Sequence, residues 1–385
     1  MWSFPAISSR VIYLDHNATT RPSEGVCEAV QAGLRAFWQN PSSVHRAGQE
    51  ARHQVELARA ATAAIIGAKP RELTFTSGGT EALDLAIRGT LEAHRGALVT
   101  TRVEHAAVRE IAEDFERREP DRVRWCPLGP DGTVDEAAFE SLLDGAALVC
   151  VQWANNETGV VQPIERLGAT ARRRGVLMCC DATQWIGKEP CAAPVADMMV
   201  FAPHKYHGPK GVGVLYARSG VRLRPRLLGT QELGRRAGTE NVPGILGAGV
   251  AATEAIAWLT DAGSRDRQRD LRDRFERAVL ERVPWAVVNA RSAPRLWNTT
   301  NIAFRALEAE ALLLLMSERG LCASAGAACS SGSLEPSPVL LALGIPPELA
   351  HGSVRFSLSK DTTADEVERA AAIVGECVGV LSKSG

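Results

Sequence analysis

The chain has 385 residues, of which 45% are hydrophobic and 23% are charged, and its formal net charge is −1. This length allows a large domain plus a smaller one, and the composition is that of an ordinary soluble globular protein. The balanced charge excludes a bulk field that would recruit nucleic acid or an acidic membrane surface, so we expect no direct contact with either.

The N-terminal residues and the cysteines indicate where the protein resides. Residues 1–10 show no basic segment followed by a long apolar stretch, so we expect no secretory signal. The longest apolar run, 311–316, is too short to span a bilayer. Nine cysteines without regular spacing indicate free thiols in a reducing environment. We therefore expect a cytoplasmic protein that makes no membrane contact.

Short apolar segments alternate with amphipathic stretches over the first two thirds of the chain. Several segments are apolar nearly throughout, which is typical of strands covered on both faces. Amphipathic stretches such as 80–94 and 163–174 lie between them. This alternation predicts an α/β fold with a mostly parallel seven-stranded sheet and helices on both faces. The strands are expected at 72–76, 97–101, 123–128, 147–152, 176–181, 198–202 and 211–217.

The pattern changes near Trp258. A charged helical stretch rich in Arg and Asp occupies 260–283, and a second α+β region follows with strands near 285–289, 300–304 and 353–358. Thr363 and Glu366 form a capping box that predicts the start of a closing helix. We therefore expect a smaller α+β region at the C-terminal end.

Two segments that follow predicted strands carry groups suited to a phosphorylated cofactor. The segment 76–81 reads TSGGTE and opens a helix, so Gly79 and Thr80 could form a phosphate cradle or a plain strand-to-helix turn. Asp181 directly follows a buried strand, where open α/β sheets bind ligands. Its carboxylate could keep a pyridinium nitrogen protonated, or it could simply cap a helix.

Three further segments add an amine, an imidazole and amides. Lys205 follows another buried strand and could form a Schiff base, although an isolated loop lysine is usually just solvated. His105 could stack on a cofactor ring or carry protons, and Asn156 could bind a ring hydroxyl or a substrate carboxylate. Taken singly, a structural histidine or a turn asparagine is the simpler interpretation.

One thiol is surrounded by small residues. Cys329 lies in the segment 324–333, which reads SAGAACSSGS, and such a loop suits a nucleophile that must travel; an incidental loop thiol is the alternative. Arg355 follows farther along the chain, and its forked guanidinium suits a carboxylate.

Together these segments resemble the cysteine desulfurases of the class V aminotransferase group, which have pyridoxal-phosphate (PLP) fold type I. The matching segments are 13–20, 40–43, 76–81, 104–105, 155–159, 181–184, 204–205, 235–241 and 327–337. They occur in family order over almost the whole chain. The long segment after Cys329 resembles the nitrogen-fixation and iron–sulfur-assembly branch. The resemblance implies a large PLP-binding domain at 15–258 and a small domain at 1–14 plus 259–385 that carries Cys329.

The resemblance also implies the site. Lys205 forms the Schiff base, His105 stacks on the ring and Cys329 accepts the sulfur. Arg355 and Asn156 bind the substrate carboxylate. Thr239 reaches the phosphate of the neighbouring subunit, which implies a homodimer. The residues implied to bind PLP are Gly79, Thr80 and His204 at the phosphate, His105 at the ring face, Asp181 at the ring nitrogen, Gln184 and Asn156 at the ring hydroxyl, Lys205 and Thr239. No metal is implied.

The activity implied is conversion of L-cysteine to L-alanine, with sulfur passed through an enzyme persulfide to an acceptor protein. The acceptor could serve iron–sulfur cluster assembly or thiolation of another cofactor or nucleic acid. The alternatives are a selenocysteine lyase, a PLP-dependent cysteine C–S lyase that would not need Cys329, and a non-catalytic PLP-binding scaffold of a sulfur-carrier complex.

The chain departs from the family pattern twice. Ala202 and Pro203 replace the usual Ser-Gly pair before the His-Lys pair, which removes a phosphate donor worth about 1.5–3 kcal/mol. Thr230 stands where the family usually has a histidine.

Overall fold

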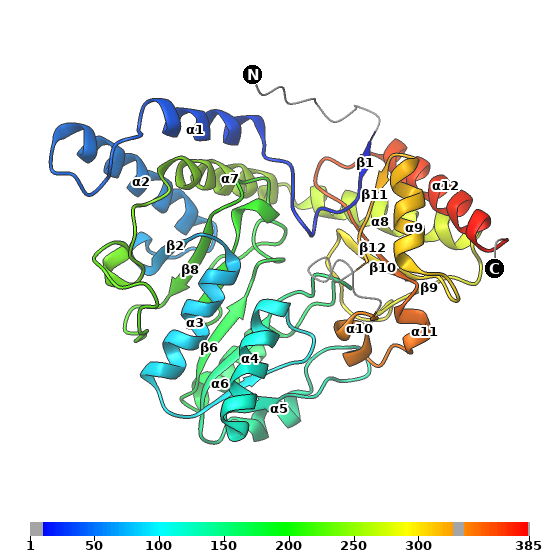
Figure 1. The fold of residues 1–385 in the computed structure, drawn as a ribbon, viewed down its shortest axis with the longest axis horizontal. Coiled ribbons are helices and arrows are strands. Elements are labelled where there is room, and N and C mark those ends of the chain that lie inside the picture. Colours follow the sequence, from blue (N-terminus) through cyan, green and yellow to red (C-terminus); the bar gives the residue numbers. More distant parts are fainter. Residues whose placement is uncertain (1–10, 326–334, 384–385) are drawn as a thin grey trace. The chain divides into compact units, whose positions relative to one another are not determined.

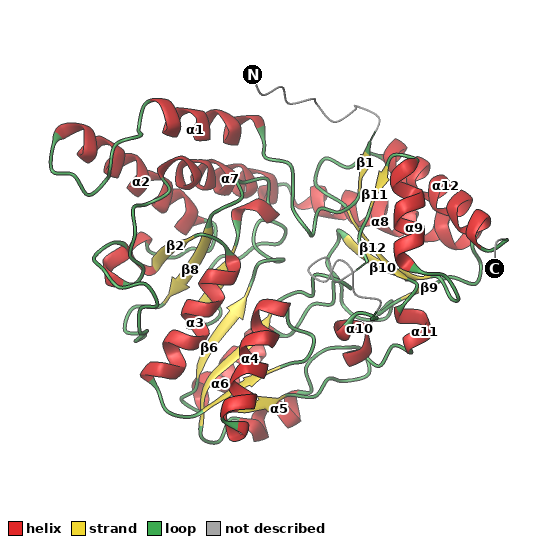
Figure 2. Cartoon of the chain, in the orientation of Figure 1, coloured by secondary structure: helices red, strands yellow, loops and turns green. Residues whose placement is uncertain are grey.

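A computed structural model describes residues 11–325 and 335–383. Its internal contacts divide the chain into two compact units. The larger unit comprises 19–155 and 161–261, and the smaller one comprises the chain up to Ala18, the segment Asn156–Val160, and the chain from Ala262 onward. Figure 1 labels elements of both units where there is room, and Figure 2 distinguishes helices from strands.

The larger unit is built on a seven-stranded sheet with the strand order β2-β8-β7-β6-β5-β3-β4. The pairs among β7, β6, β5, β3 and β4 are parallel, whereas β8 runs antiparallel to β2 and β7. The prediction of a mostly parallel seven-stranded sheet is confirmed. The strands are β2 (Leu73–Thr76), β3 (Ala97–Thr100), β4 (Val123–Trp125), β5 (Ala146–Gln152), β6 (Leu177–Asp181), β7 (Met198–Phe201) and β8 (Gly213–Ala217).

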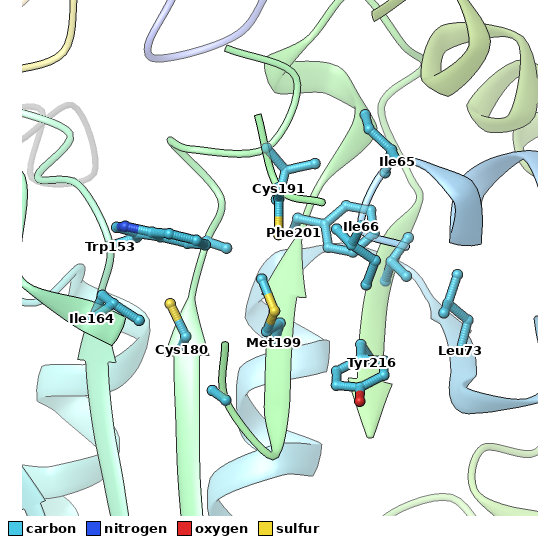
Figure 3. Close-up of a cluster of buried hydrophobic side chains, with 14 of the residues drawn as sticks. Ile65, Ile66, Leu73, Trp153, Ile164, Cys180, Cys191, Met199, Phe201 and Tyr216 are labelled. Atoms are coloured by element: carbon cyan, nitrogen blue, oxygen red, sulfur yellow. The ribbon is translucent and has the colours of Figure 1, made fainter. Parts of the chain in front are cut away.

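Alternating side chains of these strands supply two separate cores. Cys180 and Met199 belong to one core, which Figure 3 shows together with Trp153 and Phe201, whereas Cys179 and Met198 belong to the other. This alternation follows from the period of two in a strand. It also explains why several of the strand segments, such as β7 and β8, are apolar on nearly every residue.

Helices cover the sheet of the larger unit. They are α1 (Glu24–Arg35), α2 (Arg46–Ala64), α3 (Gly79–Ala93), α4 (Ala106–Arg118), α5 (Glu136–Leu142), α6 (Ile164–Arg173) and α7 (Val242–Thr260), with short 3-10 turns η1 (Pro70–Glu72), η2 (Pro120–Arg122), η3 (Pro203–Lys205) and η4 (Glu232–Gly234). By length and composition α7 could cross a membrane, but 56% of its most apolar 18-residue window is buried inside the protein, and the helix packs against α1 and α2. These contacts are those of a core helix in the larger unit.

The smaller unit contains a three-stranded antiparallel sheet with β10 in the middle and a two-stranded parallel pair of β1 with β11. The capping box of Thr363 and Glu366 is present at the start of the closing helix. Its elements are β1 (Ile12–Tyr13), β9 (Val287–Val288), β10 (Thr299–Ala303), β11 (Leu321–Cys322), β12 (Ser353–Ser357), α8 (Ala262–Arg282), α9 (Ala309–Glu318), α10 (Pro338–Ala342), α11 (Pro347–Ala350) and α12 (Ala364–Leu381).

Candidate active site

Polar segments gather at one edge of the large sheet. Apart from β8, its strands point the same way, so their carboxyl ends meet at this edge. Open α/β sheets bind ligands at that edge. The segments that follow the strand ends are 77–80 after β2, 101–105 after β3, 153–155 after β5, 182–184 after β6 and 202–205 after β7.

The first of these segments forms a cradle at the N-terminus of α3. Gly78 is the N-cap, and the first turn of a helix leaves backbone N–H groups without helical partners. A Cβ built on Gly79 would lie 3.6 Å from Thr183 Oγ1 and 3.8 Å from Ala202 Cβ, so three strand ends approach each other there. These amides and the Thr80 hydroxyl are donors of the kind that hold a phosphate.

The cradle is held closely against the sheet. A Cβ added to Gly213 of β8 would lie 2.2 Å from the Gly78 carbonyl carbon, so that strand must carry glycine for the cradle to pack. Ala202 is buried beside the cradle and offers a methyl group where a hydroxyl would be a donor.

Asp181 ends β6 and is held in place by its own turn. The Thr183 amide donates to Asp181 Oδ1 over 3.0 Å. Gln184 follows, and its Oε1 accepts a hydrogen bond from Nζ of the buried Lys188. The next residue, Trp185, stacks on Trp153 with ring centroids 4.4 Å apart. These contacts fix both the carboxylate and the amide at the end of β6.

His105 caps the N-terminus of α4. Its Nδ1 accepts the Ala107 amide over 3.1 Å, so in the neutral ring the proton resides on Nε2. Burial lowers the pKa of His105 below its ordinary value; Asp181 opposes this shift and Lys205 adds to it. The imidazole is therefore neutral near pH 7, and it lies close enough to both groups to feel their charges.

The preceding residue, Glu104, is fully buried. Its two carboxylate oxygens accept hydrogen bonds from Thr101 Oγ1 and from the Gln152 amide, both over 2.7 Å. Burial raises the pKa of Glu104 to about 8, and Asp181 contributes to the increase. A carboxyl group thus joins β3 to β5 immediately before His105.

His204 and Lys205 lie in the turn η3 after β7. The His204 carbonyl accepts hydrogen bonds from both the amide and the hydroxyl of Thr20, each over 2.9 Å, and its Nδ1 lies 3.1 Å from Thr19 Oγ1. Burial lowers the pKa of His204 to about 4, with Lys205, Lys210 and Lys188 adding to the effect. A neutral His204 can offer one N–H donor.

Arg355 lies on β12 in the smaller unit and is 2% exposed. Its Nη1 donates to the Asn156 carbonyl over 3.1 Å, and its Nη2 donates to Asp15 Oδ1 over 2.6 Å. Its buried Nε makes no hydrogen bond to the described residues. Asn17 also donates to the Asn156 carbonyl, over 3.0 Å. The guanidinium is therefore held in a fixed orientation with donor capacity to spare.

Cys329 falls outside the described residues, but described residues lie on both sides of it in the sequence. Ser324 exchanges two backbone hydrogen bonds with Arg355, over 2.7 and 3.2 Å. On the other side, the Ser337 hydroxyl donates to Glu157 Oε2 over 2.6 Å. The described residues Ser324 and Ser337, on either side of Cys329 in the sequence, therefore contact Arg355 and the residue after Asn156.

Comparison with known proteins identifies the family. The family model for aminotransferase class-V matches residues 12–370. The cysteine desulfurase of Nostoc sp. (strain PCC 7120 / SAG 25.82 / UTEX 2576) is 44% identical over 374 residues, which cover 96% of this chain and 93% of that protein. The chain belongs to the class-V aminotransferase family.

Cysteine desulfurases are among its relatives within the family. The cysteine desulfurase NifS of Azotobacter vinelandii is 43% identical over 365 residues, covering 93% of this chain and 90% of that protein. A solved NifS-like protein superposes with a TM-score of 0.88 at 32% identity, covering 96% of this chain and all of that one. The structure of SspA in complex with cysteine gives a TM-score of 0.79 at 30% identity, covering 91% and 99%. These matches confirm the predicted family and support cysteine desulfurase function.

The residues expected for a class-V site fall into three sets. The larger unit brings together, at the sheet edge, Gly79, Thr80, His105, Asp181, Gln184, His204 and Lys205, and it carries Thr239 on an exposed segment before α7. The smaller unit joins Arg355 to Asn156. Cys329 lies outside the described residues. In residues 11–325 and 335–383, no group of three or more His, Cys, Asp or Glu side chains is placed to hold a metal.

Several supporting residues were not assigned roles from the sequence. Thr19 and Thr20 hold the His204 turn, and Lys188 holds Gln184. Glu104 was recognised only as the neighbour of His105. The sequence offers little indication of these supporting roles, because each residue acts through a tertiary contact. Nothing in the structure explains Thr230, which is exposed.

Proposed function

We propose that the chain converts L-cysteine to L-alanine with PLP and places the sulfur first on Cys329. One observation supports this most strongly. An amine, a carboxylate, a neutral imidazole and a helix N-terminus meet at one edge of the sheet, in Lys205, Asp181, His105 and α3. The reaction balances, since L-cysteine and the Cys329 thiol give L-alanine and the Cys329 persulfide.

The donor set at the sheet edge fits PLP. The amides of Gly79 and Thr80, with neutral His204, are suited to the phosphate, and Asp181 is suited to hold a proton at the ring nitrogen. Gln184 presents its amide N–H₂ because Lys188 occupies its oxygen. When bound, PLP supplies the electron sink that makes removal of the Cα proton feasible.

Lys205 and His105 have separate proposed roles at this edge of the sheet. The Lys205 amine would hold the cofactor and would carry the proton removed from the substrate Cα. His105 presents an uncharged ring whose orientation is fixed by its bond to the Ala107 amide, which suits stacking on an aromatic face.

Arg355 and Asn156 orient the substrate. Asp15 and the Asn156 carbonyl hold the guanidinium, which suits it to a carboxylate in a forked geometry. L-cysteine as the substrate is supported by the cysteine bound to the relative SspA. Ser324 contacts Arg355 and Ser337 contacts the residue after Asn156, and Cys329 lies between Ser324 and Ser337 in the sequence, which supports its role as the sulfur acceptor.

A homodimer is supported by exposed apolar side chains of the larger unit. Trp38 and Val44, near the turn between α1 and α2, are 72% and 89% exposed, and Leu228 is 84% exposed. The ion pair of Arg59 with Glu232 holds α2 beside the segment that carries Leu228. A second copy of the chain would cover these side chains and bring its Thr239 to the neighbouring cofactor. The cytoplasm is the proposed location, and a thiol-bearing carrier or scaffold protein is the proposed sulfur acceptor.

Turnover of L-cysteine by the Lys205→Ala variant tests this proposal. The wild type should bind PLP with a visible absorbance band and form alanine and persulfide in equal amounts, whereas Lys205→Ala should lose the band and the alanine. Pyruvate in place of alanine would favour the C–S lyase, and a strong preference for selenocysteine would favour the selenocysteine lyase. A protein that binds PLP without turnover would be the scaffold.

A further inference from the structure

The N-terminus of α3 carries a charge that opposes phosphate binding. Glu81 lies in the first turn of α3, and its Oε2 accepts the Ser77 amide over 2.7 Å. A carboxylate in this position uses one amide of the cradle and places a negative charge beside the remaining donors. Two anions at this range repel each other in a partly buried site. The cradle therefore needs a compensating cation to accept a dianionic phosphate.

Arg236 supplies that cation. Its Nε donates to Glu81 Oε1 over 2.7 Å and its Nη2 donates to Oε2 over 3.2 Å, which is the forked pairing of guanidinium and carboxylate. Both side chains are less than a quarter exposed, at 21% and 24%. Burial by itself would raise the pKa of Glu81, but the hydrogen bonds from Arg236 and Ser77 lower it below its usual value.

The segment that carries Arg236 is fixed to the sheet independently. We call residues 227–238 the brace loop. Glu232 in this loop is buried, and its carboxylate binds Arg59 of α2 through two contacts of 2.7 Å and the Phe75 amide of β2 over 2.8 Å. The loop also closes on itself, because the Ala237 amide donates to the Leu227 carbonyl over 3.2 Å.

The backbone of the brace loop indicates that these contacts hold it in a costly conformation. Glu232 and Leu233 have φ angles of +50° and +58°, a region that residues with a Cβ seldom adopt. The Arg59–Glu232 pair and the Phe75 amide offset this cost. The amides on either side of Thr76 therefore both donate to carboxylates. The Phe75 amide donates to Glu232 of the loop, and the Ser77 amide donates to Glu81, which Arg236 of the loop holds.

We propose that the brace loop is a positioning element of the phosphate cradle and that Arg236 acts through Glu81 to make the cradle accept a phosphate dianion. Arg236 is a positioning residue, since it touches Glu81 rather than the cofactor. The proposal rests on the PLP site proposed above. It makes the phosphate selectivity of the site depend on an ion pair outside the set of cofactor-binding residues.

The test compares PLP with pyridoxal, which lacks the phosphate, by equilibrium dialysis against the apoenzyme. Arg236→Gln should lower the affinity for PLP by about tenfold or more and change the affinity for pyridoxal by less than about twofold, because only the phosphate is repelled by the unpaired Glu81 charge. Adding Glu81→Gln to Arg236→Gln should restore PLP affinity, since the amide keeps the bond to Ser77 without the charge. Glu81→Gln alone should bind PLP at least as tightly as the wild type.

Arg235→Gln is the matched control. It removes the same charge one residue away, and Arg235 donates to the Arg71 carbonyl rather than to Glu81. It should leave the ratio of PLP to pyridoxal affinity unchanged. Equal weakening of PLP and pyridoxal by Arg236→Gln would overturn the proposal, as would no weakening or a failure of Glu81→Gln to restore PLP. A wild type that binds no PLP would refute the cofactor site itself, a separate result.

Discussion

Replacing Glu104 by Gln should change how stability depends on pH. Glu104 is fully buried, and burial raises its pKa to about 8, with Asp181 contributing. In the unfolded chain the pKa of this carboxyl group lies near the ordinary glutamate value of 4.5. Between these values the folded protein holds a proton that the unfolded chain has released. The contribution of Glu104 to the free energy of unfolding is therefore fully present below pH 4.5 and is lost as the pH rises toward 8.

The size of the effect follows from the interval. Each pH unit between about 4.5 and 8 removes about 1.4 kcal/mol from the free energy of unfolding, an upper bound for a group with hydrogen-bond partners. At pH 7 the loss from Glu104 would reach about 3 kcal/mol. Gln matches the protonated carboxyl, since its oxygen can accept the Gln152 amide and its N–H₂ can donate to Thr101 Oγ1. The variant should therefore be nearly neutral at pH 5 and more stable than the wild type at pH 7.5.

Urea unfolding of the cofactor-free wild type and Glu104→Gln, at pH 5, 6, 7 and 7.5, measures this difference. The comparison is needed because burial lowers the pKa of His105 and His204, and their contribution to stability rises with pH and masks Glu104 in the wild type alone. The difference between the two free energies of unfolding at each pH cancels the contributions of the histidines to first order. A difference that stays constant with pH, or that favours the wild type more at high pH, would refute the reasoning.

Three further substitutions test the site. Gly213→Ala should lower the free energy of unfolding by about 3 kcal/mol and weaken PLP binding, because the added Cβ would lie 2.2 Å from Gly78. Gly379→Ala in α12, where a Cβ meets nothing within 4 Å, should be neutral or stabilising in the same urea unfolding measurement. Arg355→Lys should raise the KM for cysteine about tenfold or more without changing PLP affinity, since one ammonium cannot reach both Asp15 and Asn156 and still present a fork; an unchanged KM would exclude Arg355 from substrate binding. Ala202→Ser should tighten PLP about tenfold in a titration by adding a donor beside Gly79, and equal or weaker affinity would mean that the cradle is already satisfied.

The sheet was predictable because its strands carry a strong local signal. All seven predicted segments of the large sheet are strands, and several of them are apolar nearly throughout because they are buried on both faces; β4 at the sheet edge is only partly buried. The N-terminal strand β1 was missed, because two residues paired with β11 across about 300 positions leave no pattern in a short window.

The chemical groups of the site were predictable, whereas their supports were not. Asp181 ends a strand and His105 and Lys205 follow strands, so the rule that open sheets bind ligands at the carboxyl ends of their strands places all three at one edge. Lys188 and the Arg236–Glu81 pair depend on which side chains meet in three dimensions, and no spacing in the sequence reports that contact.

The position of the first sulfur atom tests the central claim most directly. After a single turnover with L-cysteine, peptide mass mapping should locate the extra sulfur on the peptide that contains Cys329. Among the eight cysteines of the described residues, six are buried, Cys322 is half-buried and Cys27 is exposed, so these last two are the competing thiols. Cys329→Ser should bind PLP normally and lose alanine formation, because a hydroxyl is a far poorer nucleophile than a thiolate. Sulfur found first on Cys322 or Cys27, or a Ser variant that forms alanine at the wild-type rate, would contradict the account.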